Sequence, residues 1–366
     1  MSGASPPVDV PRAVRPGDAL DVAALAPWLA REEPTFAGVA AADLVVEQFG
    51  DGFSNLTYLV RAGTDGTREA VLRRPPRGVG QGSAHDVLRE HRLLAALHPT
   101  YGRVPRPLAA CDDDAVLGAP FYLMERVRGV ILRGRPGEAT PDAPTLAALG
   151  DTFVRELAAV HAVDWHAAGL RAATGDYVER QVGGWARRWE AARTGDVPTV
   201  ERAAAWLEAH RPPQRELALV HNDFKYDNLV LAPDDLPRVR AVLDWEMATV
   251  GDPLMDLGSS LGYWLEPDDP PVLRALGLGL TAAAGSPGRA ALVEAYGRAT
   301  GRDVSDAVFY FVYGVFKLAV VAQQIYARHA RGLTSDPRFA RLDAVVAALG
   351  TLADRAVALG RIDRLA

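Results

Sequence analysis

Cysteine is almost absent from this chain, since Cys111 is the only one among its 366 residues. A single cysteine excludes an intramolecular disulfide and fits a reducing compartment. Such a residue usually serves as a small buried hydrophobe, so we expect Cys111 in a core rather than in a reactive site. Internal repeats and long low-complexity segments are also missing. With 49% apolar and 23% charged residues, the composition is that of an ordinary soluble globular protein.

An excess of positive charge and a membrane-length apolar run are lacking as well. The net charge is −6 and the pI is near 5.8, which gives no reason to expect a nucleic-acid partner. Residues 1–18 have no signal-peptide core and are predicted to form a flexible arm. The most apolar stretch, Ala307 to Ala322, contains Lys317 and is too short to span a bilayer, so we expect a buried helix there. These features predict a cytoplasmic protein with no membrane partner.

The remaining pattern predicts two lobes of different composition, and a chain of this length has room for both cores. Short β-type runs separated by glycine-containing turns occupy residues 43–73, a helix is expected at about 84–97, and a strand at 121–125. Beyond Gly129 the chain becomes mainly helical. The expected helices cover 144–163, 176–192, 198–210, 288–299, 306–330 and 336–358, and a β-rich insert lies at 217–244. We therefore predict an α+β protein, with a β-rich N-lobe at 19–126 and a helical C-lobe at 127–366.

The most informative motif is HNDFKYDN at 221–228, followed by Leu243-Asp244-Trp245-Glu246. Short apolar runs precede each part, so Asp223 and Asp244 are expected where a strand ends and a loop begins. Phosphoryl transfer needs such residues to orient a hydroxyl and to hold Mg²⁺. Asp223 would accept the hydroxyl proton, while Asn228 and Asp244 would offer oxygen ligands to the metal. The alternative is that Asp and Asn serve here as turn residues.

Together these motifs resemble the aminoglycoside phosphotransferase family, which has a two-lobed protein-kinase-like fold. The similarity covers roughly residues 40–330. The segments SNLTYLV and VLRRPP are similar to those of members fused to acyl-CoA dehydrogenases. The resemblance implies transfer of the γ-phosphoryl group of ATP or GTP, with Mg²⁺, to the hydroxyl of a small molecule.

The resemblance also implies a nucleotide site in the N-lobe. Residues 50–55 look like the loop over the phosphates, where backbone N–H groups bind oxygen atoms. Arg73 stands where protein kinases carry a lysine, and Glu90 matches the helix glutamate that pairs with it. The nucleotide-binding residues implied in this way are Gly52, Phe53, Ser54, Asn55, Arg73, Glu90, Glu125 and Val127. The loop has only two glycines and arginine does not replace lysine neutrally, so a plain hairpin turn and a solvated Arg–Glu pair remain alternatives.

In the C-lobe, Lys225 looks like the catalytic-loop lysine that reaches the transferred phosphate, although a surface ion pair with Asp227 is an alternative. His221 is expected to brace the loop. Asp256 resembles the residue that holds the loop backbone, and Asp252 is either part of this motif or a helix N-cap. The short distance from Asp244 to Asp256 leaves no room for a long regulatory loop.

The acceptor remains open at this level. Arg187, Arg188, Arg328 and Arg331 on or near helices of the C-lobe would suit an anionic acceptor such as a hydroxyacyl-CoA. An aminoglycoside, being a polycation, would instead need acids such as those in the Glu266–Asp269 segment. A nucleotide-binding pseudoenzyme is a further alternative, supported by the arginine at position 73. The sequence does not predict an oligomeric state.

Overall fold

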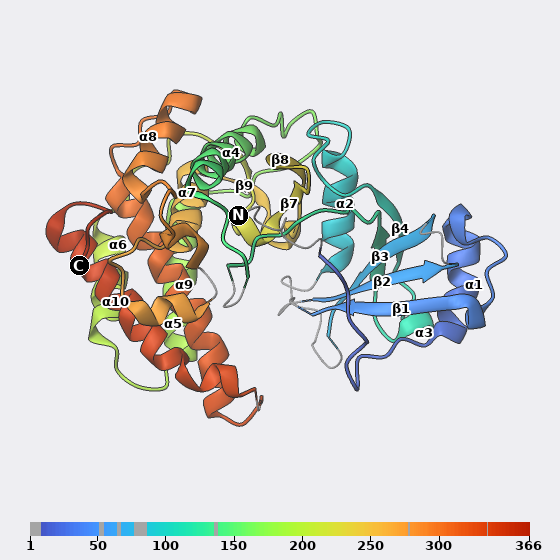
Figure 1. Ribbon diagram of the computed structural model, residues 1–366. Coiled ribbons are helices and arrows are strands. Elements are labelled where there is room, and N and C mark those ends of the chain that lie inside the picture. The colour runs from blue at the N-terminus through green and yellow to red at the C-terminus, as the bar shows by residue number, and fades with distance from the viewer. Residues whose placement is uncertain are drawn as a thin grey trace.

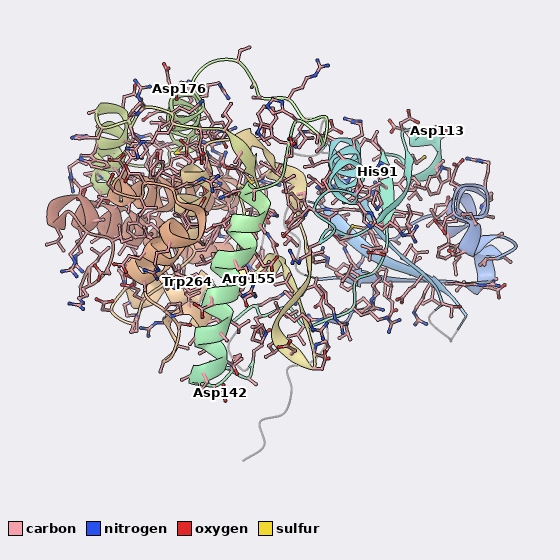
Figure 2. All side chains as sticks on the ribbon, turned by 90° about the horizontal axis from the view of Figure 1, so that it is seen from above. His91, Asp113, Asp142, Arg155, Asp176 and Trp264 are labelled. Atoms are coloured by element: carbon pink, nitrogen blue, oxygen red, sulfur yellow. The ribbon has the colours of Figure 1, made fainter. Side chains whose placement is uncertain are left out.

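The computed structural model describes residues 9–50, 55–63, 67–76, 86–134, 138–276, 279–334 and 336–366. Figure 1 shows a sheet-bearing part and a larger helical part side by side. Figure 2 gives the view from above, in which the labelled His91 and Asp113 lie in the first part and Arg155, Asp176 and Trp264 in the second. The α+β, two-lobed architecture expected from the sequence is confirmed.

The N-lobe contains one antiparallel five-stranded sheet with the strand order β1-β2-β3-β5-β4. Helix α1 lies beyond the sheet and the short helix α3 lies next to it, while α2 lies between the sheet and the helical part (Figure 1). The elements are β1 Leu44–Phe49, β2 Leu56–Ala62, β3 Arg68–Arg74, β4 Pro107–Cys111, β5 Phe121–Met124, α1 Val22–Glu32, α2 Val87–Leu97 and α3 Asp114–Leu117.

Helix α1 packs on one face of this sheet and α2 on the other, so the central strands β2, β3 and β5 are buried on both sides. Side chains alternate along a strand, so neighbours enter different cores. Leu72 and Leu123 pack in the core with α1, where Trp28 meets Phe121 at 4.7 Å between ring centroids. Tyr122 packs in the core that contains α2. This alternation directs Arg73, the neighbour of Leu72, toward α2 and the second lobe.

Two short antiparallel strand pairs flank the HNDFKYDN motif of the C-lobe. Strand β6, Ala218–Val220, pairs with β9, Thr249–Gly251, and β7, Leu229–Ala232, pairs with β8, Asp235–Val242. Residues 221–228 therefore form the loop between β6 and β7, and Asp244 follows the end of β8. The expected placement of both acids at strand ends is confirmed.

Helices make up the rest of the C-lobe. They are α4 Ala143–His161, α5 Tyr177–Ala192, α6 Pro198–Ala209, α7 Pro253–Gly262, α8 Arg289–Thr300, α9 Ala307–Ala330 and α10 Leu342–Leu359. The most extensive helix contact is that of α9 with α7, where glycines let the backbones approach closely. A Cβ built on Gly314 would lie 1.8 Å from the carbonyl oxygen of Gly258. The crossing therefore requires glycine at both positions.

Several sequence expectations need correction. Strands β4 and β9 and helix α3 were not predicted, because such short elements carry too little periodicity. Helix α7 was missed because all ten of its residues are buried, so its sequence has no polar face that would set a period. The last helix begins at Leu342 rather than at 336, after a short 3-10 turn at Pro337–Arg341. Helix α9 has 24 residues, so its length and composition would allow it to cross a membrane, but 78% of its most apolar window is buried inside the protein. The expectation of a buried helix and of a buried Cys111 is confirmed.

Candidate active site

Asp256 on α7 holds the loop between β6 and β7 by its backbone. Its carboxylate accepts hydrogen bonds from the amide N–H groups of His221 at 2.6 Å and Asn222 at 2.7 Å. Asn222 has a φ of +65°, a left-handed conformation in which asparagine is tolerated. Burial raises the pKa of Asp256, but its contacts with His161 and His221 outweigh burial and hold that pKa below the ordinary value. The buried carboxylate therefore remains ionised and fixes the start of the loop.

Asp223 is the centre of the loop's side-chain contacts. Its Oδ2 accepts from Lys225 Nζ at 2.8 Å and from Asn228 Nδ2 at 3.1 Å, and the same amide donates to the Asp223 backbone oxygen at 2.8 Å. Burial by itself would raise the pKa of Asp223. The nearby ammonium groups of Lys225 and Lys317 lower this pKa by more than burial raises it, so it lies below the ordinary value. The structure thus brings Asp223, Lys225 and Asn228 together. Lys225 pairs with Asp223 in addition to any interaction with Asp227.

His221 links this loop to the second motif. Its Nε2 lies 2.9 Å from the carbonyl oxygen of Leu243, and its ring centroid lies 4.8 Å from that of Trp245. Burial lowers the pKa of His221 despite the surrounding acids, so its ring is neutral at neutral pH. In this state Nε2 donates to Leu243, which positions the residue before Asp244. The histidine therefore braces the loop, as the sequence suggested.

Arg73 connects the two lobes through three carboxylates. Its guanidinium donates to Glu90 at 2.9 Å, to Asp244 at 2.6 Å and to Glu246 at 3.0 Å. Glu90 also accepts from the backbone N–H of Trp245 at 3.0 Å, and burial raises its pKa in spite of Arg73. The alternative of a solvated Arg–Glu pair is wrong, because Arg73 is 7% exposed and Glu90 is 1% exposed.

Glu246 and Arg89 are participants that the sequence analysis missed. Glu246 accepts from Asn55 Nδ2 at 2.8 Å as well as from Arg73, so it joins the segment after β8 to the loop before β2. Arg89 on α2 donates to the carbonyl oxygen of Glu246 at 3.0 Å and to that of Ala248. The acid of Glu246 was visible in the motif at 243–246, whereas nothing in the sequence distinguished Arg89 from other helix arginines.

The remaining nucleotide-site predictions are placed as follows. Gly52, Phe53 and Ser54 lie outside the described residues. Glu125 and Val127 are half-buried and lie just after β5, in the connection between the lobes. The amide of Glu125 donates to the carbonyl oxygen of Arg106 at 2.9 Å, which ties this connection to the segment before β4.

Oxygen donors at the motif fit Mg²⁺ with shared ligation. Asp244 has a φ of +66°, which turns it out of the strand, and its Oδ1 accepts from Arg73. The amide nitrogen of Asn228 faces Asp223, so its oxygen is directed elsewhere. Within the described ranges no cluster of three His, Cys, Asp or Glu side chains could hold a metal. One carboxylate and one amide oxygen, completed by phosphates and water, is a set that Mg²⁺ accepts and that a self-contained metal centre would not use.

A small pocket opens beside the same loop. The Nζ of Lys225 lies 4.7 Å from the centroid of the Tyr263 ring, which forms part of its wall. Its lining combines apolar and aromatic residues with charged and hydroxyl-bearing ones, namely Leu132, Arg133, Phe153, Lys225, Tyr226, Asp227, Ser260, Tyr263, Trp264, Leu280 and Thr281. A recess in which polar groups converge beside aromatic walls is typical of a small-molecule site.

Two of the three acids in the segment considered for a cationic acceptor are buried, whereas Asp268 is exposed. Glu266 is 7% exposed and Asp269 is 3% exposed. Both accept from the guanidinium of Arg289, at 3.1 Å and 2.9 Å, and Arg289 itself is fully buried. The two acids are thus paired with one arginine inside the C-lobe and do not face solvent. The N-cap alternative for Asp252 is confirmed, since its carboxylate accepts from the amides of Leu254 and Met255.

Comparisons with known proteins indicate which family the chain belongs to. The family model described as the phosphotransferase enzyme family matches residues 45–302. Acyl-CoA dehydrogenase family member 10 from Mus musculus is 36% identical over 296 residues, which are 79% of this chain and 27% of that protein. Family member 11 from Rattus norvegicus is 34% identical over 329 residues, which are 88% of this chain and 41% of that protein. The chain therefore spans less than half the length of these two relatives.

A solved structure supports the same grouping. A candidate aminoglycoside phosphotransferase from Ralstonia eutropha JMP134 superposes with a TM-score of 0.71 and 31% identity. The superposition covers 91% of this chain and 97% of that one. The similarity thus extends through both lobes, so the arrangement of sheet, loop and helices described above is that of a two-lobed kinase-like fold.

Proposed function

The chain belongs to the phosphotransferase enzyme family and is a small-molecule phosphotransferase, and from this we propose that it transfers the γ-phosphoryl group of ATP or GTP to the hydroxyl of a hydroxyacyl-CoA. The observation that carries the proposal is the meeting of Asp223, Asn228 and Lys225 in one loop, with Asp244 on the adjoining segment. This assembly argues against a pseudoenzyme, because no acid or amide of the motif is missing.

The catalytic roles follow from the charges in the loop. Asp223, kept ionised, accepts the proton of the acceptor hydroxyl as its oxygen forms a bond to the γ-phosphorus and the bond from that phosphorus to the β–γ bridging oxygen breaks. Lys225 places a positive charge 2.8 Å from Asp223, where it would offset negative charge on the transferred group. Asn228 and Asp244 would hold Mg²⁺, which supplies charge neutralisation for the phosphates.

The nucleotide would lie between the lobes. Arg73 faces this space with Glu90 behind it, an arrangement that orients a guanidinium for phosphate oxygens. Asn55 donates to Glu246, the carboxylate that also accepts from Arg73. Gly52, Phe53 and Ser54 directly precede Asn55 in the chain and are proposed to bind the phosphates with it. Glu125 and Val127, at the connection after β5, are proposed to contact the base through their backbone and side chains.

The acceptor assignment rests on two observations. The curated relatives are acyl-CoA dehydrogenase family members, and residues 45–302 of this chain carry the phosphotransferase match. The wall of the pocket beside Lys225 includes Phe153, Tyr226, Tyr263 and Trp264, against which an apolar group next to the acceptor hydroxyl would pack. Arg187, Arg188, Arg328 and Arg331 are exposed, so they are accessible to an anionic acceptor.

An aminoglycoside is the second candidate, because the Ralstonia eutropha protein is named for that activity. In the Glu266–Asp269 segment, Glu266 and Asp269 are buried against Arg289, and Asp268 alone is exposed to a polycation. This counts against the second candidate without bearing on the transfer chemistry.

The test uses purified full-length protein with Mg²⁺ and either ATP or GTP. A panel of hydroxyacyl-CoAs and a panel of kanamycin-type aminoglycosides are incubated separately, and phosphorylated products are detected by mass spectrometry. The Asp223→Asn variant controls for contaminating kinases. We expect phosphorylation of at least one hydroxyacyl-CoA that the variant does not produce. Efficient aminoglycoside phosphorylation without any acyl-CoA product would overturn the acceptor assignment, and nucleotide binding without transfer to any acceptor would favour a pseudoenzyme.

A further inference from the structure

Lysine occurs only twice in this chain, at positions 225 and 317, whereas all other basic side chains that stay charged are arginines. Arginine therefore serves wherever the protein needs a solvated positive charge or a forked ion pair. An ammonium group differs in being a compact charge with three donors on a flexible stem. Both lysines lie at the loop between β6 and β7, although 92 residues separate them in sequence. Lys225 belongs to the family motif, but Lys317 does not.

The crossing of α7 and α9 brings Lys317 to this loop. Gly258 on α7 and Gly314 on α9 are in backbone contact, since neither has space for a Cβ. Lys317 follows Gly314 by three residues and Ser259 follows Gly258 directly, so both side chains lie on the same side of the crossing. Helix α9, which is otherwise apolar where it crosses α7, thus directs one charged side chain toward the catalytic loop.

The ammonium group of Lys317 is 4% exposed and contacts the loop backbone directly. Its Nζ donates to the carbonyl oxygen of Asn222, the residue before Asp223, and to the hydroxyl of Ser259 at 3.2 Å. The charged groups that face it come from three other elements, namely Asp223 and Lys225 in the loop, Asp256 on α7 and Arg188 on α5. The Trp185 ring, also on α5, lies 5.7 Å from Nζ.

Asn222 is therefore held from both ends. Asp256 accepts its amide N–H, Lys317 donates to its carbonyl oxygen, and Tyr177 donates to its side-chain oxygen at 3.1 Å. These contacts maintain the left-handed backbone conformation of Asn222. That conformation sets the direction of the chain after β6 and therefore the orientation of Asp223. A buried ammonium group loses its hydration, so it is a costly way to stabilise a fold. A cost of this kind is typical of groups that serve an active site.

We propose that Lys317 is a positioning residue for phosphoryl transfer, which holds the Asn222 carbonyl so that Asp223 points at the acceptor hydroxyl. The proposal rests on the function proposed above, in which Asp223 is the base. It assigns to Lys317 an effect on turnover and not on nucleotide binding, because Lys317 contacts neither Arg73 nor Asp244.

The experiment compares three variants with the wild type in the full chain. Lys317→Met keeps the length and removes the charge, while Lys317→Arg keeps a charge that is never lost. Gln323→Met is the matched control, since Gln323 is a buried polar residue on the same helix whose contacts are Ala192 and Thr194, away from the loop. For each protein kcat, the KM for the nucleotide and the thermal midpoint are measured, and kcat is followed from pH 6 to pH 9.5.

We expect Lys317→Met to lower kcat by about 10-fold to 10²-fold, the effect of a small misplacement of a catalytic group, with KM for the nucleotide unchanged. Burial lowers the pKa of Lys317 to about 8, although Asp223 and Asp256 act in the opposite direction. Above that pH the wild-type amine is neutral and binds the carbonyl less strongly. The wild type should therefore lose activity as the pH rises through 8, and Lys317→Arg should not.

Two results would overturn the proposal. One is a kcat of Lys317→Met within twofold of the wild type; the other is an equal loss in Gln323→Met, which would show a purely structural effect. If Lys317→Met does not fold, the pH profiles of wild type and Lys317→Arg still decide, because identical profiles contradict the proposal. Failure of the proposed function is distinguishable, since Asp223→Asn would then retain normal turnover.

Discussion

The guanidinium of Arg73 and the carboxylate of Asp244 lie 2.6 Å apart across the space between the lobes. One comes from β3 and the other from the turn after β8, and 171 residues separate them. Arg73 also contacts Glu90 and Glu246, so one positive charge faces three carboxylates. The excess of negative charge favours a divalent cation at this point. An incoming Mg²⁺–nucleotide would offer phosphates to Arg73 and a metal to Asp244, so we expect this pair to separate when it binds.

The first prediction concerns the base. Asp223→Asn should leave the fold and the nucleotide affinity intact and should lower kcat by about 10²–10⁴-fold, the usual contribution of a positioned general base. Steady-state kinetics and calorimetry measure the two quantities. Asp234→Asn is the control, because Asp234 is an exposed residue in the β7–β8 hairpin. Near-normal turnover of a folded Asp223→Asn protein would remove Asp223 from this role.

The second prediction concerns the metal. Asp244→Ala should abolish the part of nucleotide affinity that depends on Mg²⁺, since the ion would lose its protein carboxylate. Isothermal calorimetry with and without Mg²⁺ measures this difference. Asp235→Ala, at an exposed carboxylate in the same hairpin, should bind like the wild type. If metal-dependent affinity survives in Asp244→Ala, the metal binds elsewhere.

The third prediction concerns Arg73. Arg73→Ala leaves Glu90 buried without its partner and should lower the free energy of unfolding by about 3–5 kcal/mol. The same variant should weaken ATP binding more than AMP binding, because a guanidinium in this place would contact phosphates beyond the first. Arg73→Lys should retain part of the activity.

The matched control for this series is Arg74→Ala. Arg74 is buried on the opposite face of β3, where it donates to the carbonyl oxygen of Leu117. Its loss should reduce stability without altering the ratio of ATP to AMP affinity. An equal change of that ratio in Arg73→Ala and Arg74→Ala would refute a phosphate role for Arg73.

The fourth prediction is a pH dependence of stability at the N-cap of α7. Burial raises the pKa of Asp252 from 3.8 to about 6, although the amides of Leu254 and Met255 oppose this. A raised pKa in the folded state means that the stabilising contribution is present below 3.8 and is lost as the pH rises through 6. Asparagine also caps helices but carries no charge. The free energy of unfolding of the wild type relative to Asp252→Asn should therefore fall between about pH 4 and about pH 6 and level off above that.

Urea unfolding at several pH values tests this, with Asp142→Asn as the control. Asp142 caps α4 and hydrogen bonds from Thr145 lower its pKa, so its contribution is complete above 3.8. The difference between wild type and Asp142→Asn should stay constant over the same pH range. A constant difference for Asp252→Asn as well would contradict the assigned pKa.

The fifth prediction concerns the helix crossing. Gly314→Ala would place a methyl group 1.8 Å from the carbonyl oxygen of Gly258, so the helices must separate. Overpacking of this kind costs about 1–3 kcal/mol, and the free energy of unfolding should fall by at least that much. Gly195→Ala adds a methyl group with no neighbour within 4 Å and serves as the control. Equal stability of the two variants would show that the crossing is not tight.

Local features of this protein could be predicted from its sequence. Strands β1, β2 and β3 and most long helices were predicted because their apolar periodicity extends over enough residues to be read. Asp223, Asn228 and Asp244 were identified for a similar reason: their spacing within a short segment is itself the signal. The short strand β4 was missed because a few residues carry no period, and α7 was missed because it is buried on all sides.

The sequence alone determined which residue types stand in the motif and in what order, because the chemistry depends on that local order. The tertiary structure decided which distant side chains complete the site. Glu246 reaches Asn55 and Arg73 only because the lobes face each other, and Lys317 reaches Asn222 only because two glycines let α7 and α9 cross closely. These contacts join residues 95 to 191 positions apart, and their geometry depends on the packing of whole helices and sheets, which no local pattern encodes.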